Sequence, residues 1–298
     1  MLSREDIEKE LGRGICVHPF HADNIKENSI NLTASHYAWT TKGGSYEKDS
    51  NGNYIPPCTS SAQSIKGGQS CVVGSRNNQF ILLFPHQTTI IETSEVMGVA
   101  DYIGGALHSK VGVVAKGIGH IGTMLGPGYC GHLMISLHNI TDQLIALKVG
   151  ETFISVTFDY LKTPVQRTST TVSGHVDKLA SLGIICDQST HDALTADWKS
   201  NFSGIRDRME SSRNYKEFVK KRKKSRWKQI RRCFNRQNLL AFGIGIFVLL
   251  LLYGGAYLID LYNGGSIWKN RFWDVGFSGI LLTILHSIRD FIPPSKKG

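Results

Sequence analysis

The chain has 298 residues, of which 41% are hydrophobic and 19% are charged, an ordinary composition for one or two folded domains rather than a disordered chain. The net charge of +10 suggests an anionic partner, but residues 213–236 alone hold twelve Lys or Arg and one acid. Outside that segment there are 22 basic and 23 acidic residues, so the basic character belongs to one segment. The six cysteines are scattered without CxxC spacing and the sequence opens without a secretory signal, so we expect reduced thiols and a cytoplasmic N-terminal domain.

The first half of the chain has the texture of a β domain. Residues 3–11 predict a short helix, because Ser3 can cap it and acidic residues follow in the first turn. From about residue 25 to 161, short apolar or alternating runs are separated by Gly, Asn, Pro and Asp, which is typical of many short strands. Residues 41–68 indicate a long loop or ragged hairpin. Close spacing of so many strands predicts a mainly β sandwich or barrel over residues 1–165.

The pattern after residue 161 changes first to an exposed tail and then, from about residue 191, to helix. Trp198, Phe202, Ile205 and Met209 follow one another at spacings of 4, 3 and 4, which places them on one apolar stripe. The stripe fits either a self-associating stalk or a helix that packs on its own domain. We therefore assign residues 166–238 to a helical linker that ends in the basic segment.

The C-terminal part, residues 239–298, predicts one or two transmembrane helices. Residues 239–259 carry no formal charge, and as a helix they would cover about 30 Å, the thickness of the hydrocarbon core. A shorter apolar segment at 275–292 contains charged residues, so it either returns across the membrane as the second half of a hairpin or lies in the interface.

The basic segment directly before residue 239 favours a cytoplasmic position for the N-terminal domain of a protein in the cell or inner membrane. Such a segment also attracts anionic membrane lipids. Nucleic-acid binding is the competing explanation of the same charges, but we do not expect it, because the adjacent span already accounts for them.

Residues 123–158 carry the most specific motif in the chain. They contain the turn Pro127-Gly128-Tyr129 followed by Gly131, a strand that ends in Asn139, and a Gly-Glu turn at 150–151 into a last strand. This block resembles the central block of the dUTPase and dCTP deaminase superfamily. Two upstream segments, at 28–35 and 93–118, are similar to the earlier motifs of that superfamily and occur in the same order. The resemblance covers about residues 1–162.

The resemblance implies a distorted jelly-roll, a homotrimer with sites between subunits, and a pyrimidine deoxynucleoside triphosphate as ligand. It implies that Tyr129 packs on the sugar or base and that Lys110 faces phosphate. The complete set of nucleotide-binding residues that it implies is Asn31, Lys110, Lys116, Tyr129, Ser136 and Asn139. No metal ligands are implied within the chain, and Mg²⁺ would enter only with a bound triphosphate.

Catalysis is in question because both positions of the general base are replaced. The carboxylate that holds water in dUTPases matches Gly126, and the glutamate that activates water in dCTP deaminases matches Ser136. A general base must be ionisable and within reach of the proton that it takes. Lys110, in the place of an arginine, keeps a charge but loses the bidentate fork. We therefore predict no catalytic residue and recognition without efficient turnover.

Three functions remain open at this point. The leading hypothesis is a membrane-tethered trimer that binds a nucleotide or a protein partner and acts through its spans as a sensor or effector. The first alternative is an active dCTP deaminase or dUTP diphosphatase anchored to the membrane. The second is an assembly scaffold with a vestigial pocket.

Histidines offer a further source of chemistry. His132 and His138 would share a strand face with Ser136, and a Ser-His pair can support nucleophilic catalysis, but we favour the simpler explanation that they are exposed or interfacial strand histidines. Residues 16–21, CVHPFH, superficially resemble metal ligands, yet no second cluster with zinc-finger spacing follows them.

Overall fold

The computed structural model describes residues 1–48, 54–55, 63–75, 78–119, 122–165 and 175–233, together with 247, 254, 258 and 262. The chain divides into two compact units, residues 1–218 and residues 219–298. Apart from three isolated positions, the predicted span 239–259 lies outside the described residues, and so does all of 275–292. Within the described part of the chain, no helix combines the length and the apolar character needed to cross a membrane.

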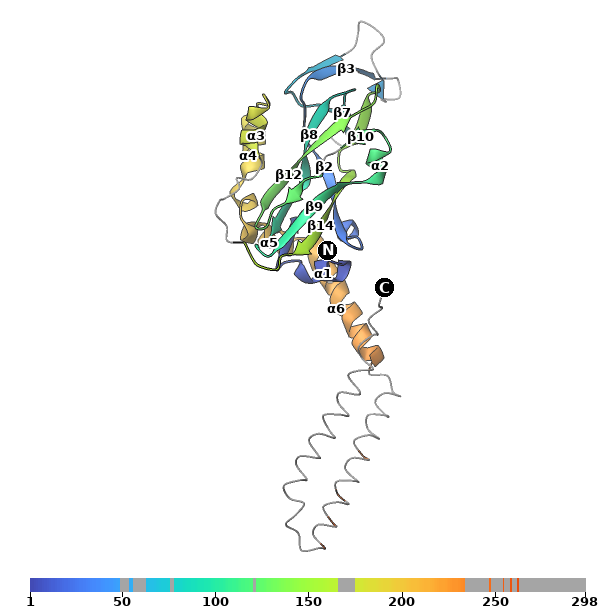
Figure 1. Cartoon of the computed structure of the whole chain (residues 1–298), viewed down its shortest axis with the longest axis vertical. Helices are drawn as coiled ribbons and strands as arrows, with labels where there is room; N and C mark the ends of the chain where they lie inside the picture. The colour runs from blue at the N-terminus through green and yellow to red at the C-terminus, as the bar shows by residue number, and fades with distance from the viewer. Residues whose placement is uncertain are drawn as a thin grey trace. The chain divides into compact units, whose positions relative to one another are not determined.

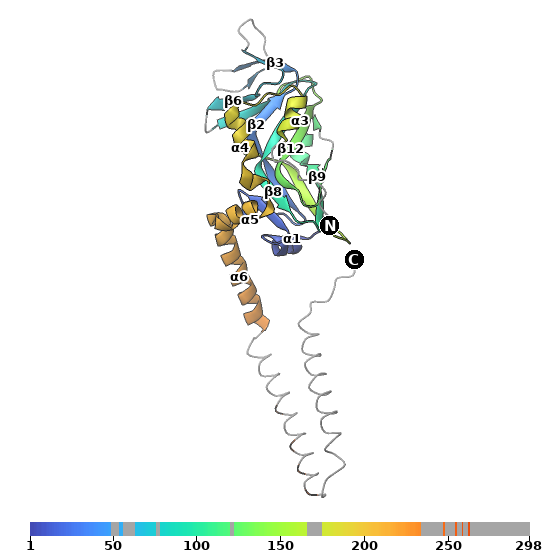
Figure 2. The same cartoon turned by 90° about the vertical axis from the view of Figure 1, so that its left-hand side faces the viewer.

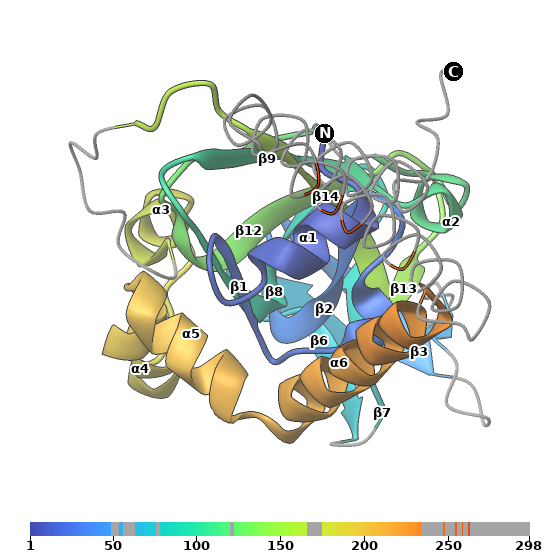
Figure 3. The same ribbon diagram turned by 90° about the horizontal axis from the view of Figure 1, so that it is seen from below.

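The first unit is mainly β, as the sequence predicts, and consists largely of one antiparallel sheet that curls on itself (Figures 1 and 3). The order of its strands is β10-β12-β8-β2-β14-β9-β11, and β1 pairs with β8 beside this path. Their bounds are β1 Ile15–His18, β2 Ser29–Thr40, β8 Thr88–Val99, β9 Ile103–Ser109, β10 Ile118–Gly119, β11 Met124–Leu125, β12 Cys130–Asn139 and β14 Thr152–Tyr160. Strands distant in sequence are therefore neighbours, since β2 lies between β8 and β14.

Two smaller sheets complete the β structure. One has the order β13-β7-β6, from Ile145–Lys148, Asn78–Leu83 and Val72–Ser75. The other has the order β4-β3-β5, from Tyr54–Ile55, Gly43–Lys48 and Gln63–Lys66. The second small sheet falls in the segment 41–68, which the sequence identifies as a loop or ragged hairpin.

Alternation along the strands builds the core. On β14, Ile154, Val156 and Phe158 are buried while the intervening Ser155 and Thr157 are partly exposed, as a period of two requires. The β12–β8 register shifts between His132 and Met134, where residues 93–95 of β8 stand opposite Leu133 alone, which marks a bulge in β8. Beyond the bulge Met134 pairs with Glu92 and Ser136 pairs with Ile90, so these four side chains leave the sheet on one face.

The short N-terminal helix is confirmed as α1, Arg4–Glu10, and the Ser3 side chain accepts a hydrogen bond from the backbone N–H of Asp6. The apolar stripe after residue 191 belongs to two elements, because Asn201 caps a new helix. Trp198 lies in the 3-10 turn η2, Asp197–Lys199, whereas the other three residues lie in α5, Phe202–Ser211. Ile205 and Met209 are fully buried, and α5 contacts β1 and β8, so the stripe packs on its own domain.

Three further helices lie around the sheet: η1, Ala22–Asn24, α2, Val111–Val114, and α3, Val176–Ser181. A fourth, α4, Gln188–Thr195, follows α3, and both lie beside β2 and β12 (Figure 2). Leu179, Ile184 and Leu194 from this helical segment form an apolar cluster with Trp39 and Ile90 of the sheet. The segment from α3 to η2 therefore covers the face of the sheet that carries Ile90.

The last helix, α6, Arg213–Cys233, begins in the first unit. Phe218 packs against Phe20 with a ring-centroid distance of 5.2 Å, and the Asn214 amide donates to the Phe20 carbonyl at 3.1 Å. The lysines that follow on α6 are exposed: Lys216, Lys220, Lys221, Lys223 and Lys224. This helix presents a concentrated positive charge to solvent.

Candidate functional site

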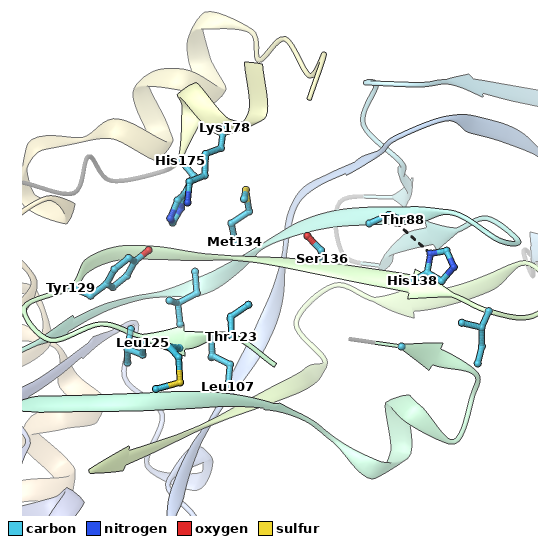
Figure 4. A pocket seen from close by; sticks show the side chains of 14 residues that line it. Thr88, Leu107, Thr123, Leu125, Tyr129, Met134, Ser136, His138, His175 and Lys178 are labelled. Carbon is cyan, nitrogen blue, oxygen red and sulfur yellow. Dashed lines mark hydrogen bonds between the residues drawn. The ribbon is translucent and has the colours of Figure 1, made fainter. Parts of the chain in front are cut away.

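A pocket of about 820 Å³ runs along β12 (Figure 4). One edge of β12 pairs with β8, and the opposite edge pairs with β10. Among the described residues this second pairing involves only His138 and Asn139, so most of that edge is left open. Met134, Ser136 and His138 come from β12, and residues 123–125 together with Leu107 come from the β11–β9 side. The other lining residues are Thr88, Gly119, Tyr129, Leu133, Ile140, His175 and Lys178. The pocket therefore lies between strand β12, strand β11 and the start of α3.

Tyr129 lies at one end of this pocket, where its ring stacks on the ring of His175 at a centroid distance of 6.1 Å and an interplanar angle of 20°. Its hydroxyl donates to the backbone carbonyl of His132. Burial raises the pKa of Tyr129 well above its ordinary value, so the phenol stays neutral. His175 has a left-handed φ of 46°, and burial lowers its pKa. One face of the tyrosine ring is thus covered by a side chain of the same molecule.

The polar groups of the pocket are neutral or basic. Ser136 is exposed, and the Thr88 hydroxyl lies 3.3 Å from Nδ1 of His138. Lys178 is exposed on α3 and contributes a positive charge to the lining of the pocket. None of the described lining residues is an aspartate or glutamate. The described residues also include no group of three His, Cys, Asp or Glu that could hold a metal ion.

Gly126 stands next to β11, at the position where the resemblance implies an acid. A Cβ atom built there meets no other atom within 4 Å, and its φ lies outside the left-handed region. The backbone therefore has room for a side chain that the sequence does not supply.

Of the six predicted nucleotide-binding residues, Tyr129 and Ser136 line this pocket.

Three of the other predicted residues lie outside the lining of the pocket and already have hydrogen-bond or ion-pair partners. The Asn31 side-chain oxygen accepts from the Ser155 hydroxyl at 2.7 Å. The Lys110 amine donates to the Thr152 hydroxyl at 2.7 Å, and the Lys116 amine is 3.8 Å from a carboxylate oxygen of Glu151. These three contacts all end on or next to β14, apart from the pocket.

The sixth residue, Asn139, is fully buried and holds a turn together. Its amide nitrogen donates to the carbonyls of Leu83 and Gln143 at 2.8 and 2.7 Å. Its side-chain oxygen accepts from the backbone N–H and the hydroxyl of Thr141 at 3.0 and 2.8 Å. All the polar atoms of this side chain are used within the fold.

Sequence reasoning missed a buried polar cluster next to the pocket, formed by Glu92, His132 and Lys199. Lys199 of η2 donates to Nε2 of His132 at 2.8 Å and to the carbonyl of Ala193. Nδ1 of His132 lies 2.8 Å from the Thr93 carbonyl, so Nδ1 carries the proton and Nε2 accepts. His132 is only 4% exposed, and burial lowers its pKa to about 4.

Glu92 is the carboxylate of this cluster, and it is completely buried. Neither of its carboxylate oxygens has a hydrogen-bond partner in the described part of the chain. Burial raises its pKa to about 8, against the opposing effect of Lys199. The one signal in the sequence is the charge itself, since Glu92 interrupts an apolar, β-branched strand at 88–93.

Comparison with known proteins supports the same fold family. A family model described as dCTP deaminase-like matches residues 1–161. The chain resembles the dCTP deaminase of Agrobacterium tumefaciens, with 13% identity over 53% of this chain and 46% of that chain, and a TM-score of 0.35. A Staphylococcus bacteriophage 80alpha dUTPase mutant with dUpNHpp matches with 18% identity over 31% of this chain and 73% of that chain, and a TM-score of 0.26. The EIAV dUTPase matches with 17% identity over 34% of this chain and 91% of that chain, with the same TM-score.

At these TM-scores the superpositions carry no argument of their own, and the matched part spans less than half of the Agrobacterium chain. Among curated protein sequences no significant match is found. The family model, in contrast, covers more than half of the present sequence. The chain therefore belongs to the dCTP deaminase-like family.

Proposed function

We propose that the β domain binds a pyrimidine deoxynucleotide in the pocket along β12 and does not turn it over efficiently. Membership of the dCTP deaminase-like family supports a role connected with nucleotides. One observation carries the second half of the proposal: no carboxylate stands at either of the two positions where the resemblance implies a group that activates water. The two positions where the resemblance implies acids are Gly126 and Ser136, which cannot accept a proton near neutral pH.

Turnover of either nucleotide depends on the activation of water. Both hydrolysis of a phosphoanhydride and deamination of a cytosine ring need a group that removes a proton from water, and losing it costs a factor of about 10²–10⁴. Binding of a nucleotide does not need such a group. An aromatic ring at Tyr129, hydroxyls at Ser136 and Thr123 and a cation at Lys178 are the groups that a base, a sugar and a phosphate require.

The proposal extends to assembly and to the membrane. We expect three copies to associate, as the family resemblance implies, with spans at 239–259 and 275–292 and the β domain on the cytoplasmic side. The exposed lysines of α6 would attract anionic lipid headgroups by about 1 kcal/mol each near the surface. A bound nucleotide would then influence the spans only through a difference in its affinity for their two arrangements.

The binding half is tested by calorimetric titration of the purified full-length chain in detergent with dCTP and with dUTP, each with Mg²⁺. We expect saturable binding of at least one nucleotide. Ser136→Trp should abolish it, because the exposed side chain enters the pocket, whereas Lys148→Ala on β13, outside the pocket, should leave it unchanged. Absence of binding to the wild-type chain would instead favour the scaffold alternative.

The membrane half is tested separately by flotation with vesicles that contain anionic lipid. We expect the full-length chain to float at high salt, and a chain that ends at residue 238 to float only at low salt, because surface charge is screened and an apolar span is not. A full-length chain that stays in the dense fraction would contradict membrane attachment.

A further inference from the structure

The position of Glu92 connects the buried cluster with the pocket. Glu92 lies on β8 directly opposite Met134 of β12, and Met134 lines the pocket. The next pair on the same face is Ile90 with Ser136, so Glu92 is the diagonal neighbour of Ser136 across the two strands. A carboxyl group is thus present one strand away from the position where the resemblance implies a glutamate.

The part of the fold that the structure describes provides no hydrogen-bonding partner for this carboxyl group. It is completely buried, and both of its oxygens lack a hydrogen-bond partner among the described residues. Lys199, whose charge acts on it, directs its hydrogen bonds to His132 and to the Ala193 carbonyl instead. Buried polar groups without partners are rare in folded proteins and each calls for an explanation, such as an absent ligand.

Met134, which pairs with Glu92 and lines the pocket, has a flexible side chain. Met134 is unbranched and partly exposed, and methionine side chains change rotamer readily to fill or vacate space. Because Met134 already lines this cavity, we expect a change of its rotamer to extend the cavity toward the carboxyl group.

We propose that Glu92 is a ligand-binding residue of the pocket, where its carboxyl group hydrogen-bonds the polar edge of a nucleobase. The inference rests on the proposed function and specifies how that site selects its ligand. A neutral carboxyl group offers one donor beside one acceptor. A pyrimidine ring offers the complementary pair along one edge, a ring nitrogen next to an exocyclic oxygen or amine. Two such hydrogen bonds in a buried site discriminate strongly against ligands that lack either group.

The state of the carboxyl group depends on the groups that face it. These are Lys199 from η2, Cys186 before α4, Tyr129 before β12, and His132 through its contact with Lys199. His132 and Tyr129 stay neutral near pH 7, because burial lowers the pKa of the first and raises that of the second. Since the pKa of Glu92 is raised to about 8, its donor should be present at pH 7 and lost above pH 8.

The test is calorimetric titration of the full-length chain with dCTP and with dUTP between pH 6 and pH 9.5, using Glu92→Gln and Glu92→Leu. Gln keeps one donor and one acceptor without titrating, so its affinity at pH 7 should match that of the wild type within about threefold. Leu removes both hydrogen bonds and should weaken binding at least about tenfold. Wild-type affinity relative to Glu92→Gln should fall above pH 8, and this ratio cancels titration of the nucleotide itself.

Glu95→Gln is the matched control, because Glu95 is also buried on β8 but receives hydrogen bonds from the backbone and the hydroxyl of Thr33 at 2.8 and 2.9 Å. It should keep the wild-type dependence of affinity on pH. Unchanged affinity in Glu92→Leu, or the same loss of pH dependence in Glu95→Gln, would overturn the inference and leave the proposed function standing. If Glu92→Leu does not fold, the pH profile of Glu92→Gln decides. A wild-type chain that binds neither nucleotide would overturn both proposals.

Discussion

The side-chain nitrogen of Lys199 lies 2.8 Å from Nε2 of His132, and this hydrogen bond links the turn η2 to the beginning of strand β12 across 67 positions of sequence. The Lys199–His132 hydrogen bond holds the η2 end of the helical segment α3–η2 against the sheet, and the Tyr129–His175 stack holds the α3 end. The cover over this side of the pocket is therefore held by two polar or aromatic contacts in addition to the apolar cluster around Leu179.

The coupling between Lys199 and His132 can be measured. Lys199→Met keeps the apolar stem but leaves Nε2 of His132 buried without a donor, which should lower the free energy of unfolding by about 1–3 kcal/mol. In a double-mutant cycle with His132→Leu, we expect a coupling energy of about 1–2 kcal/mol, because the two side chains are in direct contact. Lys178→Met on the exposed surface of α3 is the control and should change stability little. Additive effects in the cycle would show that the hydrogen bond contributes nothing.

Glu92 should make the stability of the protein fall as the pH rises. The pKa of Glu92 in the folded chain is raised from 4.5 to about 8, so the folded state keeps a proton that the unfolded state releases. Its contribution is complete below pH 4.5 and is lost between pH 4.5 and 8, at no more than about 1.4 kcal/mol per pH unit. Thermal unfolding of Glu92→Gln should therefore gain on the wild type as pH increases through this range. Melting temperatures that stay parallel would contradict a buried, protonated Glu92.

Asn139 should be a structural residue rather than a ligand contact. Asn139→Ala removes four hydrogen bonds and leaves the carbonyls of Leu83 and Gln143 with one partner fewer. We expect a loss of at least about 2 kcal/mol in the free energy of unfolding, measured by denaturant titration. Asn28→Ala, at an exposed position, should cost less than about 0.5 kcal/mol. A stable Asn139→Ala variant that loses nucleotide affinity would restore the ligand-binding role.

Gly126, next to β11, should accept a side chain, whereas Gly105 of the neighbouring strand β9 should not. Gly126→Asp places its Cβ in open space, so we expect a melting temperature close to that of the wild type. Gly105→Ala on β9 would bring its Cβ to 2.4 Å from the backbone oxygen of Thr157, which forces the strands apart and should cost about 1–3 kcal/mol. Equal destabilisation of the two variants would mean that Gly126 is required by the backbone.

Local patterns predicted much of the fold correctly. The Ser3 cap, the alternation along residues 152–160 and the apolar stripe that packs through Ile205 and Met209 each depend on neighbours in sequence. The residues of the site were harder to predict from the sequence, because their positions depend on which strands are adjacent. Tyr129, directly before β12, and Ser136 on β12 reach the same pocket, whereas the side chains of Lys110 and Asn31 bond to residues of β14 outside it. Likewise Glu92, His132 and Lys199 meet only through the β8–β12 register and the path of the helical cover, which no spacing in the sequence encodes.

We expect the pocket to bind a nucleotide without converting it. The most direct measurement is equilibrium dialysis of the full-length chain against labelled dCTP or dUTP with Mg²⁺, followed by chromatography of the bound fraction. At least one nucleotide should be retained in proportion to protein and recovered unchanged after hours. Recovery as deaminated product or as monophosphate, at a rate near the ordinary enzymatic value of about 10 per second, would contradict this expectation.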